Sequence, residues 1–355
     1  MNLKIFKLLS INILVLASML LSLEAAARLF TRVTFFGNSR NLFDITDNSY
    51  YKNCRSCKAI SAGVEVTLDS SGNRTFDDGL DPKLNSLKKT TSPSSDIVII
   101  GDSVAFGPGI PFVDTFQNQL IERHPDINFI NMSVIGHSLK QHQQTAEKIV
   151  NAYSIDSNNN RLQQVFLIYC LNDIQWSTSN ANILPKNAQS SNSEKGQFQW
   201  VDLMKSNFIF SQINKNLRDK SKLYLFVKGE FTDPYKRYFL ADLEPYRSSM
   251  FDARIKKLKL ISQKFKNANI PFTIIIVPYE YQVRNVSSDS GVLLPQNRIK
   301  SYLATNAIDY IDLYKNFASA VDNSKSLYLG YDPMHLSEKG HSILSNVISK
   351  RLYSY

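Results

Sequence analysis

The sequence has few of the residues that build metal centres and disulfide frameworks. Its 355 residues include only three cysteines and five histidines. Cys54 and Cys57 form one C-x-x-C pair, a spacing that permits a local disulfide or two free thiols. A tetrahedral zinc site needs a second such pair or two histidines nearby, and the sequence offers neither. We therefore expect no metal site.

Acidic residues are outnumbered, 31 against 41 lysines and arginines, so the formal net charge is +10. The basic residues are scattered, and the densest group is Lys256, Lys257 and Lys259. No basic segment is interleaved with aromatic residues, as nucleic-acid-binding surfaces require. Hydrophobic residues make up 43% of the chain, with 13 glycines and 12 prolines, which excludes a disordered or collagenous protein. We expect a globular protein that does not bind nucleic acid.

The first 28 residues have the pattern of an export signal. Two lysines precede an uncharged run over residues 8–23, and residues 25–27 are three alanines. A cleaved signal peptide fits this pattern, and so does an uncleaved transmembrane anchor, because the apolar run approaches the length that crosses a bilayer. Arg28 and Arg32 at its far end favour the signal anchor. In both cases the rest of the chain is periplasmic or extracellular, either tethered to the membrane or secreted.

Two further regions follow this signal. Residues 29–95 are polar and rich in Asn and Ser, and only Val64, Val66 and Leu68 alternate as an edge strand would. We interpret this region as a spacer or cap. The main domain begins at residue 96, where a short apolar run ends in Gly101 as buried parallel strands do.

From residue 96 to 355, apolar strands alternate with amphipathic helices. This alternation predicts an α/β fold with a parallel sheet covered by helices on both faces. The segment 175–247 interrupts it and is interpreted as an insertion, whose aromatic residues would pack internally or form a lid over substrate. The expected strands are 96–100, 128–132, 164–169, 271–277 and 308–313, and the expected helices are 112–123, 138–152, 249–266, 295–305 and 337–352.

Polar residues that follow three of these strands are candidates for a site, because ligands bind beyond the carboxyl ends of parallel strands. Ser103 follows the first strand on a tight turn flanked by glycines. Gly136 follows the second, where its backbone can approach a ligand closely. Asn172 follows the third and offers a side-chain amide donor.

A serine nucleophile needs a base, and His335 is the best of the five histidines. Asp332 lies three residues upstream on a turn that contains a proline, so its carboxylate can hold the imidazole in the required tautomer. His137 adjoins Gly136 and is a candidate substrate contact.

These four segments, in this order, resemble the sequence blocks of the SGNH (GDSL-type) hydrolases, a family of esterases, lipases and carbohydrate acyl esterases. The resemblance implies a three-layer α/β/α sandwich with a flavodoxin-like sheet. It also implies Ser103 as nucleophile, His335 as base and Asp332 as its partner. The backbone N–H groups of Ser103 and Gly136 and the Asn172 amide would form the oxyanion hole, with no cofactor.

The sequence departs from the family pattern at Cys170, which stands where the third block has glycine. This side chain could narrow the oxyanion hole or alter access for the acyl chain. Its place at the end of an apolar strand favours a buried structural thiol over a nucleophile.

The expected function is an exported serine ester hydrolase that removes acyl groups, such as acetyl, from a cell-surface carbohydrate or a similar ester. Three alternatives stay open: an O-acyltransferase that acts on an envelope polysaccharide through the same acyl-enzyme, a non-catalytic envelope binding protein, and a lipase.

Overall fold

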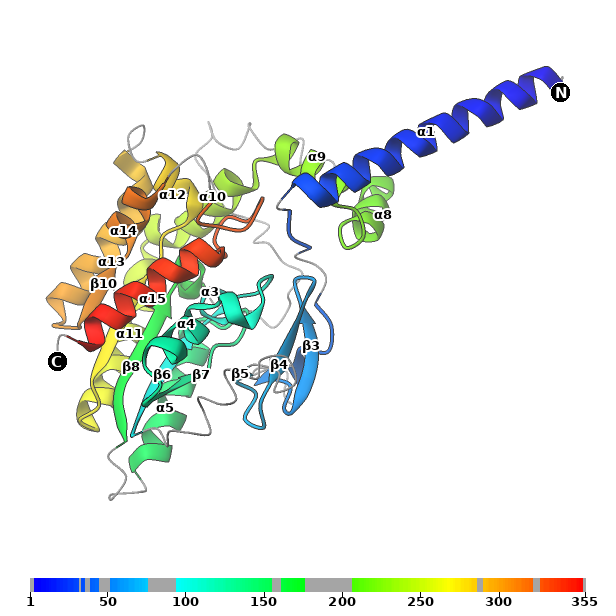
Figure 1. Cartoon of the computed structure of the whole chain (residues 1–355). Coiled ribbons are helices and arrows are strands. Elements are labelled where there is room, and N and C mark those ends of the chain that lie inside the picture. Colours follow the sequence, from blue (N-terminus) through cyan, green and yellow to red (C-terminus); the bar gives the residue numbers. More distant parts are fainter. Residues whose placement is uncertain are drawn as a thin grey trace.

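The computed structural model describes residues 3–31, 33–35, 39–44, 52–75, 94–154, 161–175, 206–285, 290–321 and 326–353. A five-stranded parallel sheet lies at its centre (Figure 1). The strand order is β10-β9-β8-β6-β7, which in chain order is the flavodoxin-like sequence 2-1-3-4-5. The strands are β6 (Ser95–Gly101), β7 (Ile127–Asn131), β8 (Leu162–Tyr169), β9 (Phe272–Ile276) and β10 (Tyr310–Asp312).

Helices cover both faces of this sheet, so the expected three-layer α/β/α sandwich is confirmed (Figure 1). One layer contains α5 (Leu139–Ser154), α11 (Met250–Asn267) and α13 (Leu294–Thr305). The other contains α4 (Phe116–Arg123), α14 (Tyr314–Ala320) and α15 (Glu338–Leu352). The short elements η1 (Phe112–Asp114), α12 (Glu280–Asn285) and η3 (Ser290–Leu293) connect them.

The helix α11 carries the densest group of basic residues in the sequence. Its buried side chains recur every three or four residues, which places them on one face against the sheet. Lys256 and Lys259 lie on the opposite, exposed face. Two of the three lysines in the densest basic group therefore lie on the solvated side of an amphipathic helix, and Lys257 is half-buried. The buried positions are Phe251, Ile255, Leu258, Ile261 and Phe265.

The region before the sheet has its own strands. β3 (Cys57–Ser61), β4 (Val64–Leu68) and β5 (Arg74–Thr75) form an antiparallel sheet, and β1 (Phe43–Asp44) pairs with β2 (Lys52–Asn53). The strand expected at 64–68 is confirmed as β4, but its expected place at an edge is wrong, because β4 pairs on both sides. Phe106 of the main domain is buried in one cluster with Val66 and Leu68, so this region packs on the main domain. Cys54 and Cys57 form a disulfide.

The described part of the 175–247 insertion is helical. It contains α8 (Phe208–Leu217), α9 (Lys222–Thr232) and α10 (Pro234–Arg247). Trp176 and Trp200 lie outside the described residues. Phe208 and Phe210 are exposed, so the expected internal packing of these two rings is wrong.

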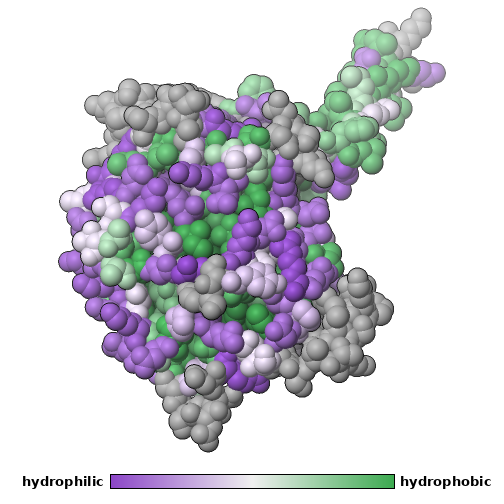
Figure 2. Space-filling model, turned by 60° about the vertical axis from the view of Figure 1, so that its left-hand side comes forward, coloured by the Kyte–Doolittle hydropathy of each residue, from purple (hydrophilic) through white to green (hydrophobic). Residues whose placement is uncertain are grey.

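The chain begins with the long helix α1 (Leu3–Phe30), which extends away from the domain (Figure 1). Figure 2 shows it as a largely apolar projection from a body whose visible face is mainly hydrophilic. Its segment Ile5–Phe30 is long and apolar enough to cross a membrane. An N-terminal apolar helix is therefore present, as expected, and Arg32 lies outside the described residues.

Candidate active site

The turn after β6 places Ser103 at the carboxyl end of the sheet. Asp102 caps the short helix α3 (Ser103–Phe106) by accepting a hydrogen bond from the Val104 N–H at 2.8 Å. Gly107 ends α3 with φ of +75°, a conformation that favours glycine. Gly101 is needed for a different reason, because a Cβ there would lie 2.5 Å from Cβ of Ala105. Both glycines therefore permit the tight turn that places Ser103 directly after β6.

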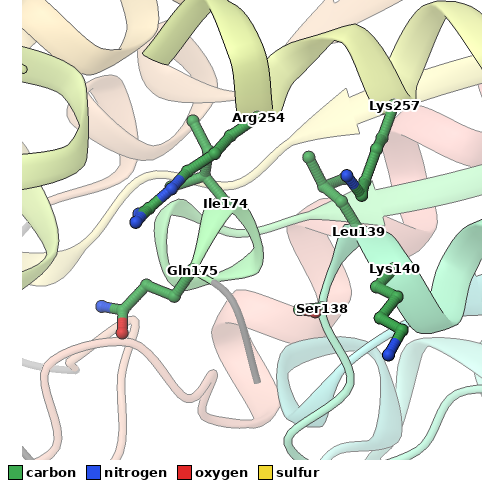
Figure 3. Close-up of a pocket in the computed structure, with 7 residues that line it drawn as sticks. All are labelled: Ser138, Leu139, Lys140, Ile174, Gln175, Arg254 and Lys257. Atoms are coloured by element: carbon green, nitrogen blue, oxygen red, sulfur yellow. The ribbon is translucent and has the colours of Figure 1, made fainter. Parts of the chain in front are cut away.

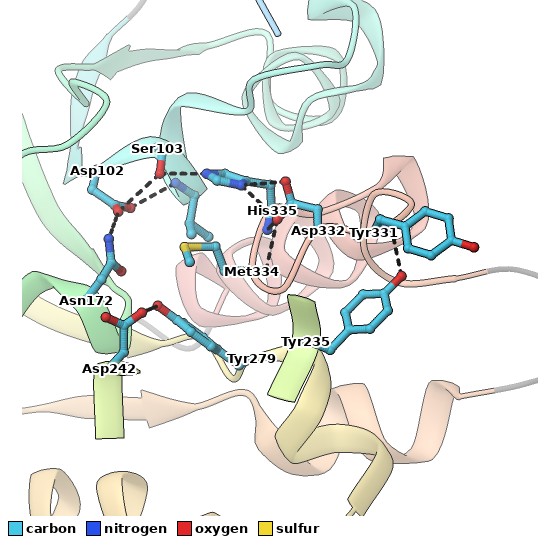
Figure 4. A network of polar contacts seen from close by, with 11 residues as sticks. Asp102, Ser103, Asn172, Tyr235, Asp242, Tyr279, Tyr331, Asp332, Met334 and His335 are labelled. Carbon is cyan, nitrogen blue, oxygen red and sulfur yellow. Dashed lines mark hydrogen bonds and ion pairs between the residues drawn. The ribbon is translucent and has the colours of Figure 1, made fainter. Parts of the chain in front are cut away.

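Ser103, His335 and Asp332 form one hydrogen-bonded chain (Figure 4). The Asp332 carboxylate lies 2.9 Å from Nδ1 of His335, and Nε2 of that ring lies 2.7 Å from Oγ of Ser103. Because a carboxylate only accepts, Nδ1 carries the proton and Nε2 is left to accept from the serine hydroxyl. This is the protonation state that a general base requires.

The backbone of the histidine loop is fixed by the same carboxylate. Oδ1 of Asp332 accepts hydrogen bonds from the N–H groups of Met334 and His335, at 3.0 and 2.8 Å. Tyr331, just upstream, has φ of +59°, an uncommon conformation for a residue with a side chain. Its N–H donates to the Tyr235 hydroxyl of α10 at 2.8 Å. The insertion therefore helps to hold Asp332, a role that the sequence gave no signal to detect.

Asn172 lies in the short helix η2 (Leu171–Ile174) and points toward the nucleophile turn (Figure 4). Its Nδ2 donates to Oδ2 of Asp102 at 2.9 Å, and this carboxylate oxygen is also 3.2 Å from Oγ of Ser103. Asp102 thus holds the amide beside the serine. An amide NH₂ carries two hydrogens, so one remains for a substrate oxygen.

Gly136 and His137 lie in the loop after β7. Gly136 has φ of +79°, which suits glycine, and the N–H of His137 donates to the carbonyl of Val134 at 3.1 Å. The His137 side chain is buried, with its ring centre 6.4 Å from that of His142. The substrate contact expected for His137 stays a prediction.

A layer of buried polar groups lies beneath the site. Burial raises the pKa of the Cys170 thiol well above its ordinary value, and nearby aspartates raise it further, so the thiol is protonated. Cys170 is fully buried, and its N–H donates to Asp173 at 3.0 Å. Burial also raises the pKa of Asp242 to about 7, although the Tyr279 hydroxyl donates to it at 2.5 Å. Asp242 belongs to the insertion and is not evident as a site neighbour from sequence.

Two residues of the N-terminal strands donate hydrogen bonds to the loops that contain Ser103 and Gly136 or lead to them. The guanidinium of Arg74 is buried at the end of α3, where it donates to the carbonyls of Phe106, Gly107 and Ile110. Burial lowers the pKa of Arg74 to about 9. Asn53 donates to the carbonyl of Ser133, in the loop that leads to Gly136, at 3.1 Å. The region expected to be a spacer or cap thus supports both the nucleophile turn and the Gly136 loop.

A small pocket lies beside this site, between α5, α11 and the end of η2 (Figure 3). No triad residue lines it. Its lining residues are Ser138, Leu139, Lys140, Ile174, Gln175, Arg254 and Lys257. Among the described residues, no group of three or more His, Cys, Asp and Glu side chains is arranged to hold a metal ion.

The strand order is the one that the resemblance to SGNH hydrolases implies. The chain is also similar to several solved structures. One is a lipolytic G-D-S-L family protein from Veillonella parvula, with 15% identity, a TM-score of 0.38, and 72% of this chain and 97% of that chain covered. Another is an acetyl xylan esterase, with 14% identity, a TM-score of 0.41, and 72% and 98% covered. A third is an acetylxylan esterase from Geobacillus stearothermophilus, with 14% identity, a TM-score of 0.40, and 73% and 94% covered.

No model of a known family matches the sequence, and no curated protein matches it.

Proposed function

We propose that this protein is a serine ester hydrolase that works through an acyl-enzyme. The observation that carries the proposal is the continuous hydrogen-bonded chain from Asp332 through His335 to Ser103. A protein that only binds its ligand has no need of this chain, so the geometry favours catalysis over the binding-protein alternative.

In the proposed reaction, Nε2 of His335 takes the proton of Ser103 as Oγ attacks the ester carbonyl carbon. The imidazolium that forms is stabilised by Asp332 through Nδ1–H. His335 then gives the proton to the leaving alcohol, the C–O bond breaks, and Ser103 carries the acyl group. Water attacks this ester with His335 again acting as the base, which releases the acid and restores the serine.

The tetrahedral intermediates carry negative charge on the former carbonyl oxygen. The proposed donors to this oxygen are the N–H groups of Ser103 and Gly136 and the second hydrogen of the Asn172 amide. One such donor contributes about 3 kcal/mol to transition-state stabilisation. Asp102 keeps the amide in place before substrate arrives, which avoids reorganisation during the reaction.

The proposed location is outside the cytoplasm, with α1 as the membrane anchor. The apolar helix supports the anchor, and the Cys54–Cys57 disulfide supports an oxidising compartment. An acylated cell-surface carbohydrate, with acetyl as the acyl group, is the proposed substrate at this location. Secretion after signal cleavage is the alternative.

An O-acyltransferase is the second candidate, because Ser103 and His335 are each only 5% exposed. A shielded acyl-enzyme reacts more slowly with water, which gives an acceptor sugar the chance to react instead.

The test uses the full chain with p-nitrophenyl acetate, butyrate and octanoate, alone and with a glycan acceptor. Hydrolysis predicts free acid in both cases, with acetate turned over fastest, whereas acylated glycan in place of free acid would identify a transferase. A clear preference for octanoate would favour a lipase. No release of p-nitrophenol, together with retained glycan binding, would favour the binding protein.

A further inference from the structure

The helix α8 carries an apolar stripe that faces outward. Its members are Ile209, Phe210, Ile213 and Leu217, which are 66%, 46%, 39% and 38% exposed and share an arc of about 100° on the helix. A helix of a globular domain normally turns such a stripe toward the core. Among the described residues, no element covers the stripe of α8.

The end of the apolar helix α1 is attached to α9. The Glu24 carboxylate accepts hydrogen bonds from the Ser221 hydroxyl at 2.7 Å and from the N–H groups of Lys222 and Leu223 at 3.1 Å. Arg28 of α1 donates to the carbonyl of Lys220 at 2.7 Å. The carboxylate caps the start of α9, where the helix dipole also favours negative charge. These bonds fix the position of α9 relative to the last turns of α1.

Side-chain hydrogen bonds link α8 to α9 in turn. Oδ1 of Asn214 accepts from the Tyr224 hydroxyl at 3.1 Å and from Nζ of Lys228 at 2.6 Å. Figure 1 shows α8 and α9 beside the C-terminal end of α1. The stripe therefore lies near the level at which α1 would leave a bilayer.

The charge around the stripe favours a lipid surface as its partner. The surface of another protein, where both signs of charge occur, would match it less well. Residues 215–228 contain five basic residues and one acidic residue. Interfacial helices combine an apolar face with basic residues, which are attracted to anionic headgroups. Phe208 and Phe231, 75% and 71% exposed, add large apolar side chains on the same pair of helices.

We propose that α8 is an interfacial helix whose apolar stripe inserts into the headgroup region of the bilayer that α1 crosses. Lipid therefore covers the stripe. This inference goes beyond ester hydrolysis and does not depend on it. Its consequence is orientation, because α9 also contacts the catalytic loop: a Cβ on Gly229 would lie 2.2 Å from the ring of Tyr331. Insertion of α8 would thus fix the orientation of the Asp332 loop relative to the bilayer, through α9.

The test places a fluorophore on the stripe of the full chain in vesicles of neutral and anionic phospholipid. Cysteine is introduced by Ile209→Cys and labelled with an environment-sensitive nitrobenzoxadiazole dye. The native cysteines do not react, because Cys170 is buried and the other two are bridged. The matched control is Leu260→Cys on α11, an exposed apolar position at 45%.

The proposal predicts a blue-shifted emission for the dye at position 209 and at least twofold quenching by lipids with a nitroxide near the headgroup. The dye at 260 should show neither effect. Equal, water-like emission at both positions would overturn the proposal. A blue shift at 209 without lipid quenching would also overturn it, because the stripe would then be covered by a second copy or by residues 176–205. Circular dichroism of both variants shows that the fold is retained, and Ile213→Cys repeats the measurement.

Discussion

Nε2 of His335 lies 2.7 Å from Oγ of Ser103, although the two residues are 232 positions apart in the chain. Ser103 directly follows β6, and His335 lies in the loop that leads into α15, so the fold brings these two loops together. The fold thus brings together two residues from opposite ends of the main domain's sequence, as the proposed mechanism requires.

Replacing Asp332 by Asn tests the role of the carboxylate. The remaining side-chain oxygen can still accept from the N–H groups of Met334 and His335, so we expect little change in the free energy of unfolding. The amide no longer fixes the tautomer or stabilises the imidazolium. We expect kcat for p-nitrophenyl acetate to fall by about 10³–10⁴-fold. Loss of stability together with activity would instead indicate a structural role.

Replacing Asn172 by Ala tests the third oxyanion donor. We expect kcat to fall by about 10²–10³-fold with a small change in KM, because the donor acts mainly in the transition state. Steady-state kinetics separates these parameters. The control is Asn128→Ala, which removes an amide that also bonds an aspartate, Asp96, at 2.9 Å, but at the other end of the sheet. Equal losses in the two variants would argue against a role for Asn172 in catalysis.

Replacing Arg74 by Met tests whether the N-terminal strands support the turn that contains Ser103. The change leaves three buried carbonyls without their donor, so we expect a loss of about 2–4 kcal/mol in the free energy of unfolding, measured with urea. Arg123→Met, at an exposed arginine that bonds Asn346, should change stability by less than about 0.5 kcal/mol. A fully stable Arg74→Met protein would show that the strands do not support the turn.

Asp242 should make stability depend on pH. Its pKa is raised by burial to about 7, above the value near 3.8 of the unfolded chain, so the native state retains a proton that the unfolded state releases. The stabilising effect of that proton is complete below about pH 4 and is lost as pH rises to about 7. Between pH 4 and 8, Asp242→Asn should remove a decline on the order of 3–4 kcal/mol.

Urea unfolding at several pH values measures this slope. The control is Asp252→Asn, because Asp252 is exposed and its replacement should leave the slope unchanged. An identical slope in Asp242→Asn and the unchanged protein would contradict the assignment.

The centre of the main sheet could be predicted from the sequence because β6, β8 and β9 each contain a continuous apolar run. The strand expected at 96–100 is β6 (Ser95–Gly101), and the helix expected at 249–266 is α11 (Met250–Asn267). The N-terminal sheet could not be predicted as fully, because β3–β5 are short and polar and gain their partners through tertiary contacts.

The grouping of Ser103, His335 and Asp332 could be predicted because Ser103 follows a strand and the other two residues precede a helix. The support of the site could not be predicted in the same way. It consists of hydrogen bonds between segments that are distant in sequence, from Arg74 to Phe106, from Tyr331 to Tyr235 and from Asn172 to Asp102. No local pattern of residues indicates such contacts.

The most direct test of the central claim is the site of reaction with a fluorophosphonate, identified by mass spectrometry of peptides from the full chain. The proposed mechanism predicts one adduct, on Ser103, that is absent from Ser103→Ala and reduced at least 100-fold in His335→Ala. The control is Ser349→Ala, which removes a second buried serine that lies 2.8 Å from a histidine, His124. That variant should be labelled as well as the unchanged protein. Labelling that persists in Ser103→Ala, or no labelling of the folded protein, would contradict the account.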